Sequence, residues 1–563
     1  MTRSEYMDLE ENLLRNRTER SRIDRSIHRI LKAADMLDEA DALGCLYAAL
    51  LKKEDADIGS STAAVNEARD ALLPADSVEL VAKLTRRLES AELKAGILWD
   101  LGLPKAARLT TPELGKLLAE LTAPGSGEHV LNAGGGWAFM NALFARQPDL
   151  DYAEINEDTS ETAMAVLRAS LLDFRSAAFP ESLDTAAYDK ALVVPDMGSW
   201  KTGRIGSEVE ADPLFTGHDV SGALRGWNKI AEVLRAVRPG GTVIAGVQTD
   251  LLVSSREAEV RQFFTERNLL KMVVVLPRSR FGKNLVSCLL VLGTNDSGII
   301  RFINTLSGSQ TDLDDQAAET WAAEILSDER KTREIRADVT ADAVRSEGYN
   351  WFPIRYMLPE ICSNIRPLGD IVHHVQRGAQ VKRESLDDYI SDEPTSVRCI
   401  YLSDLKDGIL RADDMTAVYL TQLPESLKSH VIPHHALVLA KMSLSGSELR
   451  SAVVENDTDV TLVAMDNMYV LKLDEEQVLP YYLQSYFASR DGAASLQSVS
   501  SGAVALNLSR SNLLQLPVPL PPMERQQEIG EEYRETACEC LDLRRQIEQQ
   551  ESKLKDIWRQ YLP

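Results

Sequence analysis

Hydrophobic and polar positions follow three different patterns along the 563 residues of the chain. Over residues 1–105, apolar side chains recur at helical spacing among many Leu, Ala, Glu and Arg residues, as in IHRILKAADMLDEADALGCLYAALLKK. Apolar side chains spaced three and four residues apart lie on one face of an α-helix. This part of the chain is therefore predicted to be a helical N-terminal domain.

Residues 106–300 alternate short apolar runs with amphipathic segments such as WNKIAEVLRAVRP. The runs that predict strands are EHVLNAGGG, LDYAEIN, YDKALVVP, GTVIAGVQ, KMVVVLP and SCLLVLGT. Strands that alternate with helices predict an α/β domain with a parallel, doubly wound sheet. The acidic segment that follows, 301–350, has Trp321, Ile325 and Leu326 at helical spacing, which predicts a helical connector.

After residue 350 the pattern changes to strands and turns, which predicts a separate α+β domain over 351–522 and a long helix over 523–563. Between Gly530 and Leu562 the predicted helix has no Gly or Pro. Its apolar positions, at steps of three or four residues or their multiples, are Ile529, Tyr533, Ala537, Leu541, Ile547, Leu554 and Trp558. Such a stripe suits a coiled-coil seam or packing on the helix's own domain, and the pattern favours neither.

The charge balance limits the partners that the chain can have. Its 62 Lys and Arg against 86 Asp and Glu give a formal net charge of -24, which argues against whole-surface attraction to nucleic acid or anionic lipid. Any DNA contact would need a locally basic cleft. Six cysteines without paired spacing, and histidine pairs without a third ligand, predict neither disulfides nor a metal site. No apolar run reaches ~18 residues, so we expect a cytoplasmic protein without a membrane partner.

A glycine cluster follows the first predicted strand of the α/β domain. It contains Gly134 and Gly136, and the second predicted strand ends at Glu154. Glycines at this position let a nucleotide-like ligand approach backbone amides, and an acid at the end of the second strand holds ribose hydroxyls. Taken alone, the glycines are equally well explained as a tight turn without a ligand.

This domain resembles the methylation subunits of type I restriction-modification systems, which are adenine-N6 DNA methyltransferases that use S-adenosylmethionine. The resemblance rests on RLTTPELGKLL, AEINEDTSETAMAVLRASL and REAEVRQFFTERNLLKMVVVLPRSRFGKNLVSCLLVL. It implies a Rossmann-like methyltransferase fold. The cofactor-binding positions that it implies are Thr111, Pro112, Asn132, Gly134, Gly136 and Glu154, and the catalytic tetrad falls on Val194, Pro195, Asp196 and Met197.

The chain departs from the family's sequence pattern at the cofactor-binding and catalytic positions. Where the family has Asp-Pro-x-x-Gly-x-Gly, this sequence reads NAGGGWA. Val194 replaces an Asn that accepts hydrogen bonds from the flipped adenine, and Met197 replaces an aromatic residue that stacks on it. Losing one preorganised contact costs ~10²–10³ in rate, so we expect an inactive or strongly impaired enzyme.

Two other functions stay open at this point. Asp196 could supply an acceptor in a shifted register and Trp200 a stacking face, which would give an active methyltransferase with a non-standard loop. Alternatively, the chain is a non-catalytic assembly or regulatory subunit. No nuclease signature or Gly-x-x-x-x-Gly-Lys-Ser/Thr loop is present in the sequence, so cleavage or translocation would come from a partner.

The C-terminal part resembles a target-recognition domain of type I specificity subunits. The resemblance is most specific over SVSSGAVALNLSRSNLLQLPVPLPPMERQQEI. It implies sequence-specific binding of double-stranded DNA, and the candidate contacts near predicted loops are Arg377, Lys382, Arg383, Lys441 and Arg450. Separate specificity subunits typically carry two such domains, so a second copy, paired through the long helix, is an expected partner, besides methylation or restriction subunits.

Overall fold

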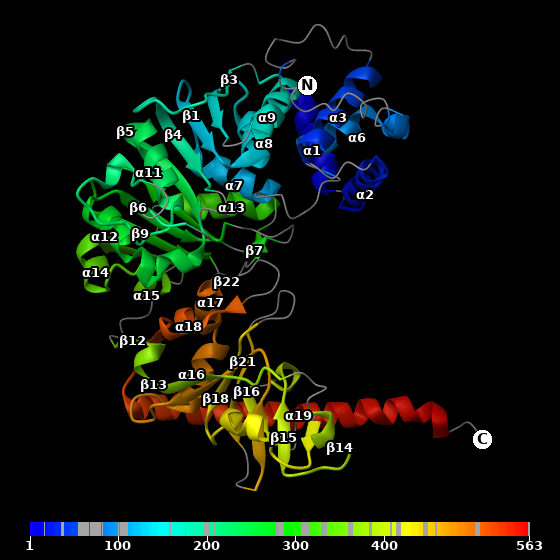
Figure 1. The fold of residues 1–563 in the computed structure, drawn as a ribbon, viewed down its shortest axis with the longest axis vertical. Coiled ribbons are helices and arrows are strands. Elements are labelled where there is room, and N and C mark those ends of the chain that lie inside the picture. The colour runs from blue at the N-terminus through cyan, green and yellow to red at the C-terminus, as the bar shows by residue number, and fades with distance from the viewer. Residues whose placement is uncertain are drawn as a thin grey trace. The chain divides into compact units, whose positions relative to one another are not determined.

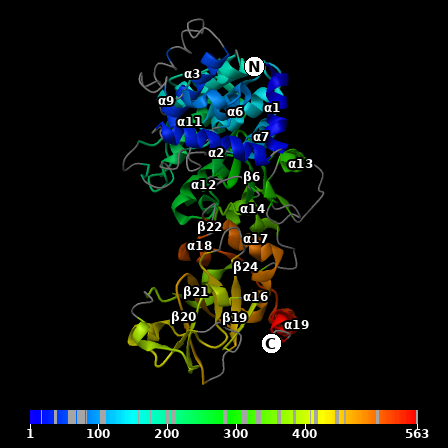
Figure 2. The ribbon, with the colours of Figure 1, turned by 90° about the vertical axis from the view of Figure 1, so that its right-hand side faces the viewer.

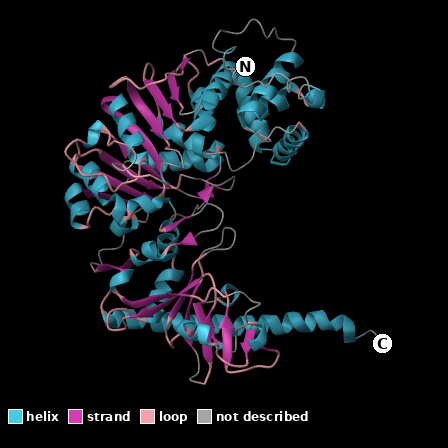
Figure 3. Cartoon of the chain, in the orientation of Figure 1, coloured by secondary structure: helices cyan, strands magenta, loops and turns pink. Residues whose placement is uncertain are grey.

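The computed structural model describes most of the chain, in two compact units, Met1–Pro353 and Ile354–Pro563 (Figure 3). The described residues are 1–15, 17–34, 39–54, 67, 80, 83–99, 101, 111–156, 159–174, 176–195, 200, 203–205, 210–276, 278–279, 286–305, 312–313, 315–327, 335–357, 364–381, 386–405, 408–412, 418–442, 449–455, 459–501 and 507–560. Within these ranges, no helix has both the length and the apolar character needed to cross a membrane.

The first unit is built on a nine-stranded mixed sheet in the order β11-β9-β6-β8-β5-β4-β1-β2-β3 (Figure 1). The strands are β1 (His129–Ala133), β2 (Asp151–Ile155), β3 (Ala177–Ala178), β4 (Tyr188–Val193), β5 (Val237–Val247), β6 (Leu270–Val275), β8 (Cys288–Leu292), β9 (Ile299–Asn304) and β11 (Arg336–Thr340). The strand order reverses between β2 and β4, on either side of β1. This is the topological switch point at which open α/β sheets bind ligands.

Five neighbouring strands of this sheet, β3, β2, β1, β4 and β5, are parallel to one another. Strand β8 lies between β5 and β6 and runs antiparallel to both. The sheet with helices on both faces is a Rossmann-like α/β fold, and the predicted α/β class is confirmed. The antiparallel directions of β8 and β11 were not predicted. An apolar run such as CLLVL in β8 looks the same in either direction, because both faces of the central strands are buried.

Helices cover both faces of the sheet (Figure 1). They are α7 (Pro112–Thr122), α8 (Gly136–Arg146), α9 (Thr159–Leu172), α11 (Gly226–Ala236), α12 (Ala258–Glu266), α13 (Asp315–Leu326) and α14 (Ala341–Ser346). The N-terminal helices are α1 (Arg3–Arg15), α2 (Arg17–Ala33), α3 (Glu39–Lys53) and α6 (Ser90–Leu98). Their buried side chains join one hydrophobic core with those of α8 and α9, and the Tyr6 ring stacks on Trp99 and meets Phe144 edge-on. The predicted N-terminal helices therefore share a core with the α/β sheet.

The segment predicted as a helical connector, 301–350, is instead part of the first unit. It completes β9 and supplies β11, and α13 buries Trp321 and Ile325 in the common core while Leu326 is exposed. The helical part of the prediction is α13. The strands were missed because IIRFIN is a short run interrupted by a charge, which is too short to give a clear period-2 signal.

The second unit contains a five-stranded sheet, β13-β21-β18-β19-β16, and a four-stranded sheet, β14-β17-β15-β20. These strands are β13 (Val372–Arg377), β14 (Ile390–Ser391), β15 (Val397–Ile400), β16 (Gly408–Arg411), β17 (Val418–Leu420), β18 (Leu437–Ala440), β19 (Ser451–Glu455), β20 (Thr461–Ala464) and β21 (Met468–Leu473). Short strands β22 (Ser500–Ser501) and β23 (Asn507–Leu508) form a separate pair. The helices include α16 (Pro480–Ala488), α17 (Arg490–Ser498), α18 (Arg510–Leu514) and α19 (Met523–Gln560).

Helix α19 runs beside α16 (Figure 2) and continues past the strands of its own unit (Figure 1). Its first half is packed, with Ala537 and Leu541 buried against Ile409 of β16. Farther along, three apolar side chains are exposed: Leu543 at 58%, Ile547 at 57% and Leu554 at 67%. We call these three residues the α19 stripe. The first half therefore fits packing on the helix's own domain, and the exposed apolar side chains of the second half fit a coiled-coil seam. The side chain of Trp558 is outside the described part.

Candidate functional site

The side chain of Asn132, at the end of β1, is fully buried and bonded within the protein. Its amide nitrogen donates to the Tyr152 hydroxyl at 2.8 Å and to Glu154 Oε2 at 3.0 Å. Its Oδ1 accepts a hydrogen bond from the Gly135 backbone N–H at 2.8 Å. Asn132 therefore ties the glycine turn to β2.

Glu154, the acid predicted to hold a ribose, is only 4% exposed. Its Oε2 also accepts a hydrogen bond from the Tyr152 hydroxyl, and its Oε1 accepts one from Asn156 Nδ2 at 3.1 Å. Burial raises the pKa of Glu154 above its ordinary value and raises that of Tyr152 as well. Both carboxylate oxygens thus already have partners from β2 or the residue that follows it.

The glycine turn after β1 packs directly on the chain that follows β4. Gly134 has φ 90°, and a Cβ at this position would lie 2.3 Å from the carbonyl oxygen of Val194. The Val194 N–H in turn donates to the Ala133 carbonyl oxygen at 2.9 Å. Gly134 is therefore required by the close approach of two backbone segments, which corresponds to the ligand-free interpretation of the glycines.

The predicted catalytic tetrad is described only in part. Val194 is 7% exposed and Pro195 is buried, whereas Asp196 and Met197 lie outside the described residues. Trp200, the alternative stacking residue, is also buried and meets the Trp227 ring edge-on at a centroid distance of 5.7 Å. A Cβ at Gly226 would lie 2.8 Å from the Trp200 ring. Trp200 is thus a packing residue against the start of α11.

Thr111 and Pro112 form the start of α7. The Thr111 hydroxyl accepts a hydrogen bond from the Leu114 N–H at 3.3 Å, which caps the helix, and Pro112 occupies its first turn. Ser and Thr are favoured at the N-cap because their hydroxyl accepts a hydrogen bond from a backbone N–H of the first turn, which has no partner within the helix. Pro is favoured at the first helical position because it has no N–H there. The local fold explains these two residues fully.

These observations test whether the predicted positions fit S-adenosylmethionine. Glu154 accepts one hydrogen bond at Oε1, from Asn156, and a carboxylate oxygen can accept a second one from a ribose hydroxyl. On the side of Gly134 to which a Cβ would point, the Val194 carbonyl oxygen fills the space. Asn132 has no charge with which to replace the family's aspartate. The glycine turn and Asn132 thus depart from the resembled motif, whereas Glu154 retains acceptor capacity at Oε1.

In the second unit, three of the predicted DNA contacts lie at the same end of the five-stranded sheet. Arg377 pairs with Tyr469 at the end of β13, and Lys441 follows β18, where its N–H donates to the Asn467 carbonyl oxygen at 2.7 Å. Arg450 immediately precedes β19, and its carbonyl oxygen accepts from the Ala440 N–H. With strands spaced ~4.8 Å apart, the backbones at Arg377 and Lys441 are roughly 10 Å apart.

These three residues, Arg377, Lys441 and Arg450, form what we call the basic sheet end. Arg377 and Arg450 are exposed and Lys441 is half-buried. The exposed Asp466, in the turn before β21, is an acidic group at the same end. Lys382 and Arg383, the other two predicted contacts, lie outside the described residues.

Sequence reasoning missed one basic residue near this end of the sheet, Arg510. The Leu508 N–H donates to the Lys441 carbonyl oxygen at 2.9 Å, and Asn507 pairs with Met442. This pairing brings the exposed Arg510, at the start of α18, toward Lys441. No local signal could have found it, because its place depends on a pairing between distant segments.

The histidine pairs have only ordinary neighbours. The His434 and His435 rings are tilted by 30° to each other with centroids 4.0 Å apart, and His373 Nε2 lies 3.9 Å from Asp474 Oδ1. Where the structure describes the chain, no group of three or more His, Cys, Asp or Glu side chains could hold a metal ion.

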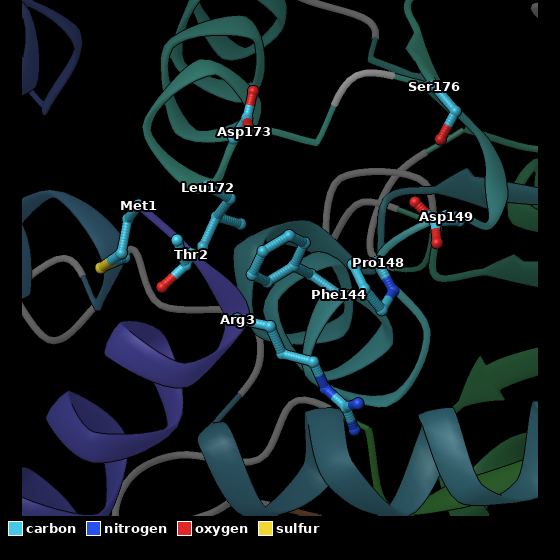
Figure 4. A pocket seen from close by; sticks show the side chains of 9 residues that line it. All are labelled: Met1, Thr2, Arg3, Phe144, Pro148, Asp149, Leu172, Asp173 and Ser176. Carbon is cyan, nitrogen blue, oxygen red and sulfur yellow. The ribbon is translucent and has the colours of Figure 1, made fainter.

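In the first unit, a cavity of about 340 Å³ lies among the first residues of the chain, α8 and the end of α9 (Figure 4). Its lining residues are Met1, Thr2, Arg3, Phe144, Pro148, Asp149, Leu172, Asp173 and Ser176. The loops before β2 and β3 contribute to it, so it lies at the amino end of these strands. None of the predicted site residues lines it.

No family model matches the sequence, and no curated protein matches it. Among solved structures, the methyltransferase subunit of a type I restriction-modification system from Streptococcus thermophilus is 14% identical, over 60% of this chain and 99% of that one, with a TM-score of 0.41. The type IIG restriction endonuclease BpuSI is 12% identical, over 94% of this chain and 75% of that one, with a TM-score of 0.39. The HsdS subunit from Thermoanaerobacter tengcongensis is 14% identical, over 33% and 40%, with a TM-score of 0.24. At such scores and identities, these likenesses do not bear on activity, substrate or partners.

Proposed function

We propose that the chain is a sequence-specific DNA-binding protein of a restriction-modification or phage-defence system, and that its methyltransferase-like unit is a scaffold. The observation that carries this proposal is that Arg377, Lys441 and Arg450 all lie at one end of the five-stranded sheet. In a chain of net charge -24, binding to a polyanion requires such local clusters.

The chemistry of DNA recognition fits exposed basic groups on strand ends. Arg and Lys hold phosphates and fix the register of a protein on the duplex, while Arg reads guanine edges in the major groove. The rigid strands of the sheet hold the backbones of all three residues in a fixed order. Double-stranded DNA is therefore the partner that we assign to the basic sheet end.

The scaffold part of the proposal is supported by the hydrogen bonds at the carboxyl end of β1 and β2. Glu154 and Asn132 satisfy each other and their neighbours, and the backbone after β4 fills the space at Gly134. An adenine-N6 methyltransferase would also need a hydrogen-bond acceptor where this chain has Val194.

Removing a charge from the basic sheet end is expected to weaken DNA binding. The target would first be selected from a random duplex library, and affinity then measured by fluorescence anisotropy over a range of salt concentrations. If Arg377→Ala or Arg450→Ala removes a phosphate contact, affinity falls for all sequences and the log–log salt slope decreases by about 0.9. If it removes a base contact, the loss is about 1–3 kcal/mol and confined to the selected target.

Arg525→Ala is the matched control, because Arg525 is an exposed residue of the same unit that pairs with Glu528.

The wild-type protein is also expected to transfer no labelled methyl group from S-adenosylmethionine to the selected DNA. Transfer that is lost in Glu154→Gln would establish the active methyltransferase instead. A folded protein that binds neither DNA nor cofactor would be an assembly subunit.

We also propose that a second copy of the chain covers the α19 stripe, and that methylation or restriction subunits are further partners. Leu543, Ile547 and Leu554 lie at steps of four and seven residues, the spacing of a coiled-coil seam.

Ile547→Glu with Leu554→Glu is expected to convert a dimer into a monomer in sedimentation at micromolar concentration. The control, Gln546→Glu with Gln549→Glu, adds the same charge beside the stripe and should remain dimeric. A monomeric wild-type protein would contradict self-association.

A further inference from the structure

Helix α2 carries a line of basic side chains on its outward face. The opposite face is buried, with Ile23, Ile27 and Leu31 in the core of the first unit. On the outward face, Arg22, Arg25, Arg29 and Lys32 are exposed and follow one another at steps of three or four residues. Residues at these steps lie in one row along a helix. We call these four residues the α2 stripe.

The α2 stripe differs in charge from the chain around it. Helix α2 has six Lys and Arg against two acidic residues, in a protein of net charge -24. Arg22 forms an ion pair with Glu92, and Arg25 Nε donates to the backbone carbonyl oxygen of Ser21. Among the side chains that the structure describes, no carboxylate lies within ion-pair distance of Arg25, Arg29 or Lys32. These three charges are therefore available to an anionic partner.

The position of α2 leaves this face accessible within its unit. In Figure 1, α2 lies on the outer side of the N-terminal helices, away from the nine-stranded sheet. Its buried face already packs on α1 and α6. Between Arg22 and Lys32, every exposed side chain is charged or polar, so this face offers no apolar surface to a hydrophobic partner.

We propose that the α2 stripe binds the phosphate backbone of double-stranded DNA without reading its sequence. At 1.5 Å per residue, Arg25 and Lys32 are ~10 Å apart along the helix axis, a length over which each strand of a duplex carries about three phosphate charges, measured along the duplex axis. Arginine is suited to phosphate because its planar guanidinium donates two parallel hydrogen bonds. The choice of DNA as the polyanion rests on the function proposed above.

This contact would give the two units different tasks in binding. The α2 stripe would supply affinity for any duplex, while the basic sheet end would add discrimination among sequences. Because acidic residues predominate in the chain as a whole, the stripe would also restrict where a duplex can approach the first unit.

The test compares Arg25→Gln/Arg29→Gln with Arg86→Gln/Arg256→Gln in the full-length protein. Both pairs remove two positive charges at exposed positions of the first unit. For the α2 variant, affinity for selected and random duplexes should fall by the same factor, about tenfold, and the log–log salt slope should decrease by about 1.8, or 0.9 for each lost phosphate contact. The control should keep nearly the wild-type slope, and Arg25→Lys/Arg29→Lys should restore most of the affinity.

Circular dichroism would verify that the variants remain folded, as expected for exposed side chains. The inference is overturned if the α2 variant binds DNA with unchanged affinity and slope, or if it loses only the binding of an acidic protein partner. If the wild-type protein binds no DNA at all, the proposed function fails as well. If the wild type binds and the α2 variant binds equally well, only the α2 inference fails.

Discussion

Gly134→Ala is expected to destabilise the first unit by about 3–5 kcal/mol. The left-handed backbone at φ 90° costs an alanine roughly 1–2 kcal/mol. The larger part comes from the new Cβ, which would lie 2.3 Å from the Val194 carbonyl oxygen, an atom of the backbone that cannot rotate away. Relief requires the chain after β4 to move, and with it the bond from the Val194 N–H to Ala133. Urea unfolding of the full-length protein measures the loss.

Gly127→Ala separates the two causes. Gly127 has a similar backbone, with φ 80°, but no described atom lies within 4 Å of the position that its Cβ would take. We therefore expect only the conformational cost of about 1–2 kcal/mol. Equal losses in the two variants would contradict a tight contact between the glycine turn and Val194, and would reopen the case for a ligand at this turn.

The second large effect is expected at Glu455, which fastens α19 to the five-stranded sheet. Its carboxylate accepts hydrogen bonds from Arg411 Nε at 2.9 Å, from Arg534 Nε at 2.7 Å and from the Tyr481 hydroxyl. The side chain is 14% exposed. Burial opposes its ionisation, but the hydrogen bonds from Tyr481, Arg534 and Arg411 prevail and hold the pKa of Glu455 at about 2.

Glu455→Gln is expected to destabilise the second unit by about 2–3 kcal/mol at pH 7, because two guanidinium groups lose their counter-charge. This figure lies below that for a fully buried pair, since the Arg534 side chain is 53% exposed and solvent screens it. The pKa is lower in the folded state than in the unfolded chain. The stabilisation is therefore complete above about pH 4.5 and is lost as the pH falls toward 2.

Hydrogen exchange in the first half of α19, together with urea unfolding at pH 7 and pH 3, would measure both effects. The wild type and Glu455→Gln should differ at pH 7 and approach each other at low pH. Glu425→Gln is the control, because the Glu425 pair with Lys428 is exposed at the surface and should contribute less than about 0.5 kcal/mol. A gap between wild type and Glu455→Gln that stayed constant down to pH 2 would contradict the assigned pKa.

The sequence was sufficient for the α/β class and for the main strands, because runs such as YDKALVVP and KMVVVLP are long and apolar. It could not supply the directions of β8 and β11, since strand direction leaves little trace in a buried run. The inclusion of β9 and β11 in the sheet depends on long-range pairing, as does the core that the N-terminal helices share with α8.

The geometry of the candidate sites also depends on pairing between segments that are distant in the sequence. Asn132 and Glu154 could be picked out as motif positions, but their mutual hydrogen bond depends on the register of β1 with β2 and on Tyr152. Likewise, Arg377 and Lys441 were predicted separately as near loops. Their common position arises from the pairing of β13, β21 and β18, which no local pattern encodes.

The distal half of α19 has a consequence for how the protein behaves at different concentrations. A charged helix that lacks tertiary contacts is marginal in water, because helix formation alone gains little free energy. Leu543, Ile547 and Leu554 lose contact with water only when another surface covers them. The free energy that orders this half would then come from association, and mass action would make it depend on concentration. The outer turns of α19 would fray in a dilute sample and become ordered in a concentrated one.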